Sequence, residues 1–426
     1  MVSDGKTATE PRQNDPAPAA DIAPDPRLLV REKGLAGYLE DFRRRIRGGE
    51  LGSIPVVFGV IIIAIIFEVE TGTFLTPRNL SNIAIYIAGP GIMAVGIVLV
   101  LLLGEIDLSV GSMAGLSAAI WGVLSVSHGV NDLLAILLAL AAGAVVGTIH
   151  GFFFARIGVP AFVVTLAGFL GWSGVQIWVM GEEGTLNIPR DSLVRDIYGF
   201  YFSDISAAYS LAAVITGGYV LALWRHERRR AGAGLPTRPR SEILLRGGLV
   251  AAAAFITAYT LNQHRGLPLA LVIFLAVLLL ADFMVRRTTY GRQIFAVGGN
   301  AEAARRAGIN VERVRLTVFT IAGTLAAFGG LFLAAQNGGA AKSLGSGNLL
   351  MNVIAAAVIG GTSLFGGRGW IWSALLGTLV IQSIETGLNL MNMSSEISYM
   401  ITGAVLLIAV VLDSVSRRTQ RTAGRT

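Results

Sequence analysis

Residues 290–316, YGRQIFAVGGNAEAARRAGINVERVRL, form a polar and basic stretch between two long apolar runs. Asn300 is a favourable N-cap residue, and Glu302 follows it in the first turn, where an acidic side chain is stabilising. Arg305 and Arg306 fall in the last turn, where cations are favourable, and Gly308 stands where a C′ glycine ends a helix. The pattern predicts a helix of about two turns, which is too short to be stable alone in water. Such a helix is either an ordinary connector or an element that docks on something else.

The composition around this stretch is that of a membrane protein. The chain of 426 residues is 53% hydrophobic and 14% charged, with a mean hydropathy of +0.65, whereas soluble proteins carry about 25% charged residues. Several apolar runs approach the roughly 20 residues that cross a bilayer as a helix. The 53 glycines favour close helix packing, and the lack of cysteine excludes disulfides and thiolate chemistry. We expect an all-α polytopic membrane protein with about ten to twelve transmembrane helices.

The arginines predict how this chain is oriented in the membrane. The expected apolar segments are 54–67, 80–103, 111–126, 133–154, 160–180, 205–224, 247–261, 267–285, 317–336, 349–362, 370–390 and 397–412. With this assignment every arginine cluster falls on one side, which the positive-inside rule places in the cytoplasm together with both termini. Because the arginines lie next to spans, the net charge of +7 does not indicate a nucleic-acid partner. Pro90 predicts a kink in the second segment, and the shorter glycine-interrupted segments are candidates for re-entrant helices.

These patterns divide the chain into three parts. Residues 1–50 are expected to form a disordered cytoplasmic tail, 51–415 a transmembrane domain with a cytoplasmic loop at 286–316, and 416–426 a second cytoplasmic tail. Gly5, Lys6 and Thr7 are similar to the end of a phosphate-binding loop, but the first glycine of that motif would precede residue 1. We therefore expect no nucleotide hydrolysis and no cofactor on this chain.

Two carboxylates interrupt the apolar sequence at residues 104–111, GEIDLSVG. Glu105 and Asp107 would each cost about 2.5–3.5 kcal/mol at the centre of a bilayer. Asp107 or Ser109 could cap the next helix in either of two interpretations. One interpretation is a solvated turn between two spans. The other is a broken-helix junction or a hydrated path inside the bundle. The residue spacing alone leaves both interpretations open.

Polar residues within the later spans are candidates for a solute path. They are Gln336, Asn337, Asn352, Gln382, Glu385 and Asn389. Gln382, Glu385 and Asn389 share one face of a helix by their spacing. The alternative is that these side chains only join helices, a contact worth about 0.6 kcal/mol on average. The histidines are scattered and show no metal-binding spacing.

Four motifs together resemble one family. Glu302, Ala303 and Ala304 followed by Gly308 are similar to the EAA-x3-G coupling motif of bacterial ABC-importer permeases. The stretch GEIDLSVG, the stretch VPAFVVTLAG at 159–168 and the stretch IGGTSLFGG at 359–367 resemble permeases for pentoses and related monosaccharides. The extra pair of spans around residues 262–268 looks most like the xylose-transporting branch. The four matches occur in the family's order and cover residues 54–415.

The resemblance implies a membrane subunit with the larger importer fold in the bacterial inner membrane, surrounded by lipid. Its expected partners are an ATPase subunit that binds the ATP, a periplasmic sugar-binding protein and a second permease copy. The residues expected to contact the ATPase are Asn300, Glu302, Ala303, Ala304, Arg305 and Gly308. Those expected to form the translocation path or a broken-helix junction are Glu105, Asp107, Ser109, Gln336, Asn352, Gln382 and Glu385.

Three other hypotheses come from the residues themselves. An autonomous sugar transporter could use Glu105, Asp107 and Glu385 as a proton relay. A membrane enzyme has no nucleophile–base set, metal cluster or cofactor loop in its favour. A similarity between residues 104–122 and 361–377 suggests an internal duplication, because each has a glycine-flanked polar turn before a helix of small residues.

Overall fold

The computed structural model describes residues 54–235, 237 and 240–422. Its helices are α2 Ile54–Thr71, α3 Pro77–Tyr86, α4 Ala88–Leu102, α5 Val110–Gly122, α6 Asp132–Phe152, α7 Ala161–Met180, α8 Leu193–Gly199, α9 Ile205–Gly232, α10 Arg240–Asn262, α11 Leu269–Arg287, α12 Thr289–Gly299, α13 Ala301–Arg306, α14 Val311–Gln336, α15 Leu349–Ile359, α16 Ser373–Leu390 and α17 Ser395–Thr422. Short π-helices, η1 Val123–Ser127 and η2 Phe153–Ile157, extend α5 and α6. The expected N-terminal tail lies outside the described residues.

The expected all-α membrane architecture is confirmed, because each of the twelve predicted apolar segments forms a helix or a pair of helices. Seven helices in the described part are long and apolar enough to cross a bilayer, or eight if the pair α3–α4 counts as one broken span. This pair bends by 42° at Ile87, so the break lies before Pro90. Pro90 itself sits in the first turn of α4, where the missing N–H costs no helical hydrogen bond.

The apolar helix α15 is too short to cross by itself. α15 has 11 residues, which is roughly 16 Å at 1.5 Å per residue, against a hydrocarbon thickness of about 30 Å. The chain then turns through 360–372 and returns as α16, which packs against α15. This geometry agrees with the expectation that glycine-interrupted segments are broken or re-entrant.

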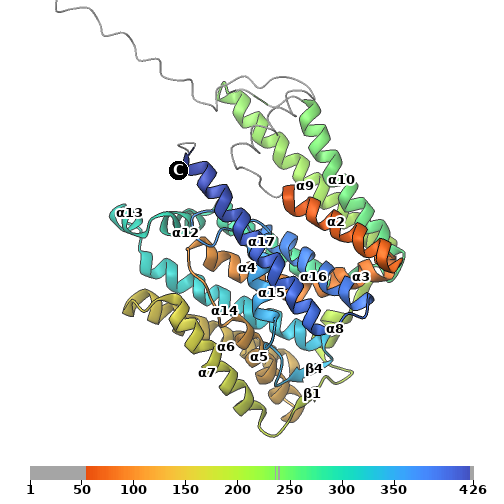
Figure 1. Ribbon diagram of the computed structural model, residues 1–426, viewed down its shortest axis with the longest axis vertical. Helices are drawn as coiled ribbons and strands as arrows, with labels where there is room; N and C mark the ends of the chain where they lie inside the picture. The colour runs from red at the N-terminus through yellow and green to blue at the C-terminus, as the bar shows by residue number, and fades with distance from the viewer. Residues whose placement is uncertain (1–53, 236, 238–239, 423–426) are drawn as a thin grey trace, which may run out of the picture.

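The centre of the bundle is formed by α4, α5 and α14, which are largely buried (Figure 1). Glycines on α6 bring this helix close to α14, as the four-residue glycine spacing suggests. A Cβ atom at Gly147 would lie 2.3 Å from the carbonyl oxygen of Phe319, and one at Gly143 would lie 2.6 Å from that of Gly323. A larger side chain at either glycine would therefore force the two helices apart.

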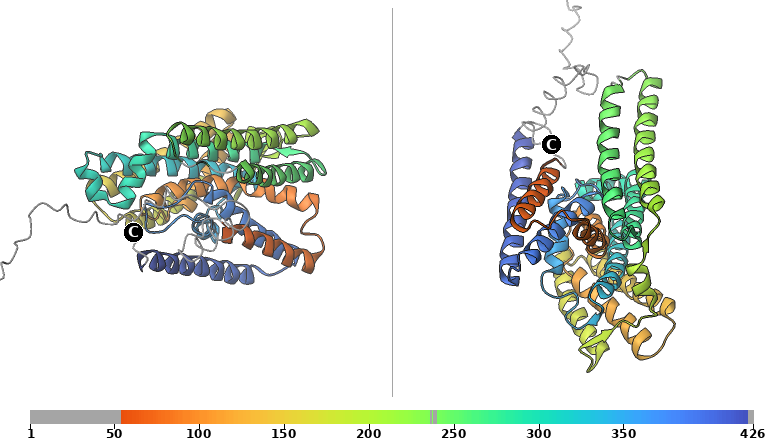
Figure 2. Two further views of the ribbon diagram at one scale, coloured as in Figure 1. Left: turned by 90° about the horizontal axis from the view of Figure 1, so that it is seen from above. Right: turned by 90° about the vertical axis from the view of Figure 1, so that its right-hand side faces the viewer.

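The periphery is less tightly joined. α9 and α10 lie side by side as a long pair that protrudes beyond the rest of the bundle (Figures 1 and 2). Two small antiparallel pairs hold the loops: β1 Thr185–Asn187 with β4 Gly339–Ala341, and β2 Tyr201–Phe202 with β3 Leu267–Pro268. α13 lies at one edge of the molecule beside α12 (Figure 1).

Candidate functional site

The polar stretch at 290–316 folds into two short helices, α12 and α13, before α14 begins. The predicted caps of α13 are present. The side chain of Asn300 accepts a hydrogen bond from the Ala303 backbone N–H at 2.9 Å. At the other end Gly308 has a φ of +83°, and the N–H groups of Gly308 and Ile309 donate to the carbonyls of Arg305 and Ala304, both at 3.0 Å. This pattern is a Schellman motif. The helix itself has six residues, so it is slightly shorter than expected.

The charges of α13 are paired within the helix. Glu302 accepts from Arg305 at 3.1 Å and from Arg306 at 3.3 Å, and all three side chains are more than half exposed. Pairs at this spacing add only about 0.2–0.5 kcal/mol to an isolated helix. Their main consequence is that α13 presents a preformed, mixed-charge surface.

The two alanines of the motif have different surroundings, which corrects one expectation. Both were expected to be small because a partner protein presses against them. Ala303 is exposed, but Ala304 is 4% exposed and packed inside this chain. The tertiary structure of this chain alone accounts for the small side chain at 304, so only Ala303 remains available to a partner.

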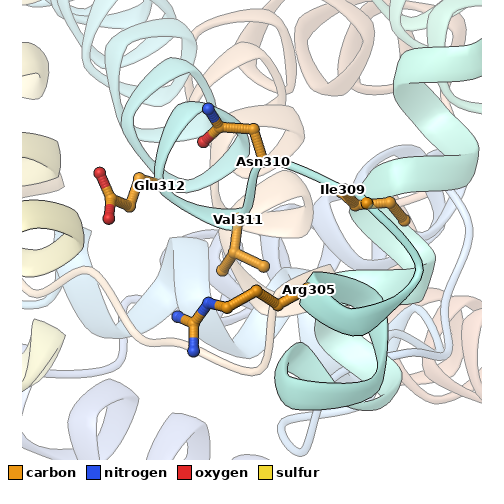
Figure 3. Close-up of a pocket in the computed structure, with 6 residues that line it drawn as sticks. Arg305, Ile309, Asn310, Val311 and Glu312 are labelled. Carbon is orange, nitrogen blue, oxygen red and sulfur yellow. The ribbon is translucent and has the colours of Figure 1, made fainter.

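A surface hollow of about 330 Å³ lies where α13 meets the start of α14. Figure 3 shows that Arg305 borders it on one side, while Val311 and Glu312 border it on the other. Polar and apolar atoms both contribute to its wall. The hollow and the exposed face of α13 form one continuous surface.

Side chains beyond this hollow connect α14 with the α4–α5 junction. Arg315 lies 3.9 Å from a carboxylate oxygen of Glu105, and its guanidinium lies 4.4 Å from the ring centre of Phe154. Arg156 pairs with Glu312 at 3.7 Å. Burial raises the pKa of Glu105, and the Arg315 guanidinium opposes this shift. The start of α14 is thus joined to two neighbouring parts of the bundle.

The junction itself is not a solvated turn. Asp107 is 1% exposed, and its side chain accepts hydrogen bonds from the N–H and the hydroxyl of Ser109 at 2.8 and 2.5 Å. Ser109 stands at the N-cap position of α5 but its side chain does not cap the helix, because its hydroxyl is bound to Asp107. Glu105 is partly exposed, with a quarter of its side chain accessible. The solvated-turn interpretation is therefore wrong for Asp107, and the expected capping role is wrong for Ser109.

His150 completes this buried cluster, and the sequence analysis did not find it. Its Nδ1 lies 3.2 Å from the Ser109 hydroxyl, and its Nε2 accepts a hydrogen bond from the Trp172 indole at 2.9 Å. Because an indole N–H can only donate, Nε2 carries no proton, so a neutral ring donates from Nδ1 to Ser109. The signal in the sequence was a lone histidine on a glycine-rich span.

This order of groups does not form a hydrolytic triad. A nucleophilic serine needs a histidine that accepts its proton and a carboxylate that orients the histidine. Here the hydroxyl of Ser109 donates to Asp107, and His150 donates to the same hydroxyl. The cluster joins α5, α6 and α7 at the junction and has no activated nucleophile. Among the described residues, no group of three or more acidic or histidine side chains could hold a metal ion.

A second polar site lies at the other end of α14. Gln336, Asn352, Gln382 and Glu385 line a pocket of about 180 Å³. The Asn352 amide donates to the carboxylate of Glu385. The remaining lining residues are Pro90, Leu333, Asn348, Leu349, Thr378 and Ile381.

Of the six polar residues that the sequence offers in the later spans as candidates for a solute path, the structure brings four together in this pocket. Asn337 and Asn389 do not line the pocket, and both are exposed. Glu105, Asp107 and Ser109 lie beyond the far end of α4 and belong to the junction instead. α14 is 26 residues long, so the pocket lies roughly 39 Å along this helix from its start beside α13.

These features define a polytopic helical membrane protein, which has an exposed capped helix at one end of α14 and a polar pocket at the other. The family model described as "Branched-chain amino acid transport system / permease component" matches residues 79–410, and the chain belongs to this family.

The curated relatives are themselves transport permeases. The xylose transport system permease protein XylH of Escherichia coli K12 is 37% identical over 85% of this chain and 92% of its own length. The protein of the same name from Haemophilus influenzae is 34% identical over 85% of this chain and 96% of its own. The ribose import permease protein RbsC of Escherichia coli K12 is 31% identical over 83% of this chain and 91% of its own. No solved structure matches this chain.

Proposed function

We propose that this chain is the membrane-spanning subunit of an ATP-driven importer for a monosaccharide, in particular D-xylose or a related pentose. The observation that carries this proposal is the similarity to xylose permeases over more than nine-tenths of their length. The pocket agrees with it, because sugars require hydrogen-bonding side chains in an otherwise apolar wall. The expected partners are an ATPase subunit, a periplasmic sugar-binding protein, a second copy of this chain and the lipid of the inner membrane.

In this proposal α13 contacts the ATPase. Its exposed face carries Glu302, Ala303 and Arg305, while Asn300 and Gly308 fix its two ends. A displacement of α13 reaches α14 within five residues and then Arg315, which faces Glu105 at the junction. Closure of the ATPase would therefore move the α4–α5 junction and, along α14, the distant pocket.

The same proposal places α13 and both chain ends in the cytoplasm and the pocket toward the periplasm. The arginine-rich end of α9 lies on the cytoplasmic side in this orientation. A sugar delivered by the periplasmic protein would then meet Gln336, Asn352, Gln382 and Glu385 first. The translocation path is expected to continue from there toward the junction.

The proton-relay alternative is not favoured by the geometry. Glu385 lines the pocket, whereas Glu105 and Asp107 lie beyond the opposite end of α4, roughly 22 Å along a 15-residue helix. Asp107 is also bound to Ser109 and fully buried. These carboxylates do not form one chain of proton acceptors.

Reconstitution tests the proposal directly. The full chain would be placed in proteoliposomes with the ATPase and sugar-binding protein that are encoded beside its gene. We expect uptake of D-xylose that requires ATP and the binding protein, and no uptake by this chain alone under a pH gradient. Uptake driven by the pH gradient alone would overturn the ABC-importer proposal in favour of an autonomous transporter.

A further inference from the structure

The wall of the pocket is rich in oxygen acceptors and contains no basic side chain. Of its ten lining residues, one is acidic, five are neutral polar residues and four are apolar. The acceptors include the carboxylate of Glu385 and the amide carbonyls of Gln336, Asn352 and Gln382. A solute with several hydroxyl donors would satisfy such a wall.

Two of these acceptors have no donor in the described part of the protein. They are Oε1 of Gln336 and Oδ1 of Asn352, both buried. The Asn352 amide nitrogen is already committed to Glu385. Because a buried polar atom without a partner typically costs about 1–3 kcal/mol, a bound solute that brings hydroxyl groups offsets a penalty already present in the empty protein.

The pocket also lacks a partner for an anion. Its nearest positive element is the N-terminus of α15, where Asn348 and Leu349 line the pocket. A helix N-terminus carries roughly half a positive charge. Asn352, in the second turn of α15, already binds the carboxylate of Glu385, so this partial charge already has an acidic group beside it. The carboxylate of a sugar acid would meet a wall that contains the carboxyl group of Glu385, carbonyl acceptors and no basic side chain.

The size of the pocket limits the solute further. An apolar cavity of about 150 Å³ admits a benzene molecule. The pocket of about 180 Å³ therefore suits one six-membered ring with its substituents, such as the pyranose form of a pentose.

From these observations we propose that this pocket is a selectivity site, which admits a single neutral, hydroxyl-rich ring and rejects anionic solutes of the same size. Sugar acids are rejected because they are anions, and branched-chain amino acids, to which the family description refers, lack the hydroxyl donors that the wall requires. The inference deepens the proposed function, because it assigns substrate class to a site within this chain.

The test uses single cysteines, because the chain contains none of its own. Asn348→Cys places a thiol in the pocket wall, and Asn389→Cys places one on the exposed end of α16 outside the pocket. Full-length variants in proteoliposomes would be treated with a small thiol reagent in the presence of D-xylose, D-xylonate or L-leucine. We expect D-xylose to slow modification of the first variant severalfold and not of the second. D-xylonate is expected to protect neither variant because it is an anion, and L-leucine is expected to protect neither because it has no hydroxyl donors.

A charge variant then tests the cause of the rejection. In the Asn348→Cys background, Glu385→Gln retains an acceptor for Asn352 and removes the negative charge. We expect it to allow protection by D-xylonate. Protection by D-xylose should fall by no more than roughly tenfold, because the Gln side chain still accepts a neutral hydrogen bond and only the added strength of a charged one is lost. Glu396→Gln, on an exposed acid at the start of α17, is the matched control and should leave the selectivity unchanged.

Two results would overturn the inference. One is the absence of protection by D-xylose, and the other is equal protection by D-xylose and D-xylonate in the Asn348→Cys variant. These outcomes are independent of the reconstituted uptake assay. Uptake of D-xylose without protection contradicts the pocket alone, whereas protection without ATP-dependent uptake contradicts the importer proposal alone.

Discussion

The two ends of α14 differ in how their sites are built. At the start, α13 is held by local contacts: its caps, its ion pairs and its terminal turn all join residues within five positions of one another. At the far end, the pocket takes its wall from α4, α14, α15 and α16, which are separated by up to hundreds of residues. The first site can keep its shape while it moves against a partner. The second must change shape whenever these helices move relative to one another, which is the behaviour that alternating access requires.

The largest expected effect concerns the side of the membrane on which each end lies. Arg229→Cys lies in the arginine-rich end of α9, and Thr185→Cys lies in β1, which pairs with β4 just after α14. In intact cells an impermeant thiol reagent should label the second variant and leave the first unlabelled. If Arg229→Cys is labelled and Thr185→Cys is not, the proposed orientation is wrong. The pocket end of α14 would then face the cytoplasm.

Tryptophan at each alanine of α13 should separate docking from folding. Ala303→Trp adds a bulky side chain to the exposed face, so we expect loss of uptake and weaker ATPase copurification with an unchanged Tm. Ala304→Trp adds the same side chain where the chain is already packed, and overpacking typically costs about 1–3 kcal/mol. Its Tm in detergent should fall as well. Equal Tm values for the two variants would contradict the assignment of Ala304 to the interior.

Replacement of either junction carboxylate should reduce uptake, but only replacement of the buried one, Asp107, should also reduce stability. Asp107→Leu removes the acceptor of two buried Ser109 donors, so we expect loss of uptake and a destabilisation of about 1–3 kcal/mol. Glu105→Leu removes a partly exposed partner of Arg315, so uptake should fall while the Tm changes little. ATPase copurification is the control and should persist in both variants. Uptake at the normal rate in both would show that the junction does not transmit movement.

The smallest expected effect is within the pocket. Gln382→Leu removes an amide from the wall, whereas Asn389→Leu removes one from the same helix face outside the pocket. One hydrogen bond contributes about 0.5–1.5 kcal/mol, so the first variant should raise the KM for D-xylose roughly two- to tenfold. The second should leave it unchanged. A similar KM shift in both variants would indicate that the pocket does not bind the sugar.

Local features of the fold were predictable because they depend on neighbouring residues. The caps of α13, the close glycine face of α6 and the break near Pro90 were all expected and are present. The similarity of residues 104–122 and 361–377 remains a hypothesis. In the structure their two glycine turns lie against each other, because a Cβ at Gly366 would approach Gly104 to 2.7 Å.

The predictions that proved incomplete or wrong concern contacts between distant segments. The sequence does not predict a role for His150, because nothing near it in the chain shows that Ser109 and Trp172 lie within hydrogen-bonding distance. The sequence predicts that Ala304 faces a partner protein, because a small residue in a short exposed helix suggests a docking surface. Its burial within this chain depends on how α13 packs against other segments, which the local sequence does not show. Asn389 was grouped with Gln382 and Glu385 by helix periodicity, yet the pocket ends before it reaches Asn389.

The sequence by itself determined that the chain is a helical membrane protein, which stretches form its long apolar helices, and which of its motifs resemble those of a family. Apolar length, cap residues and arginine position act over a few residues, so they can be read without a fold. The tertiary structure decided which polar groups meet. It buried Asp107 with His150, placed Arg315 beside Glu105 and gathered four polar side chains around one pocket. Those contacts follow from helix packing, whose geometry depends on the side chains of every helix involved.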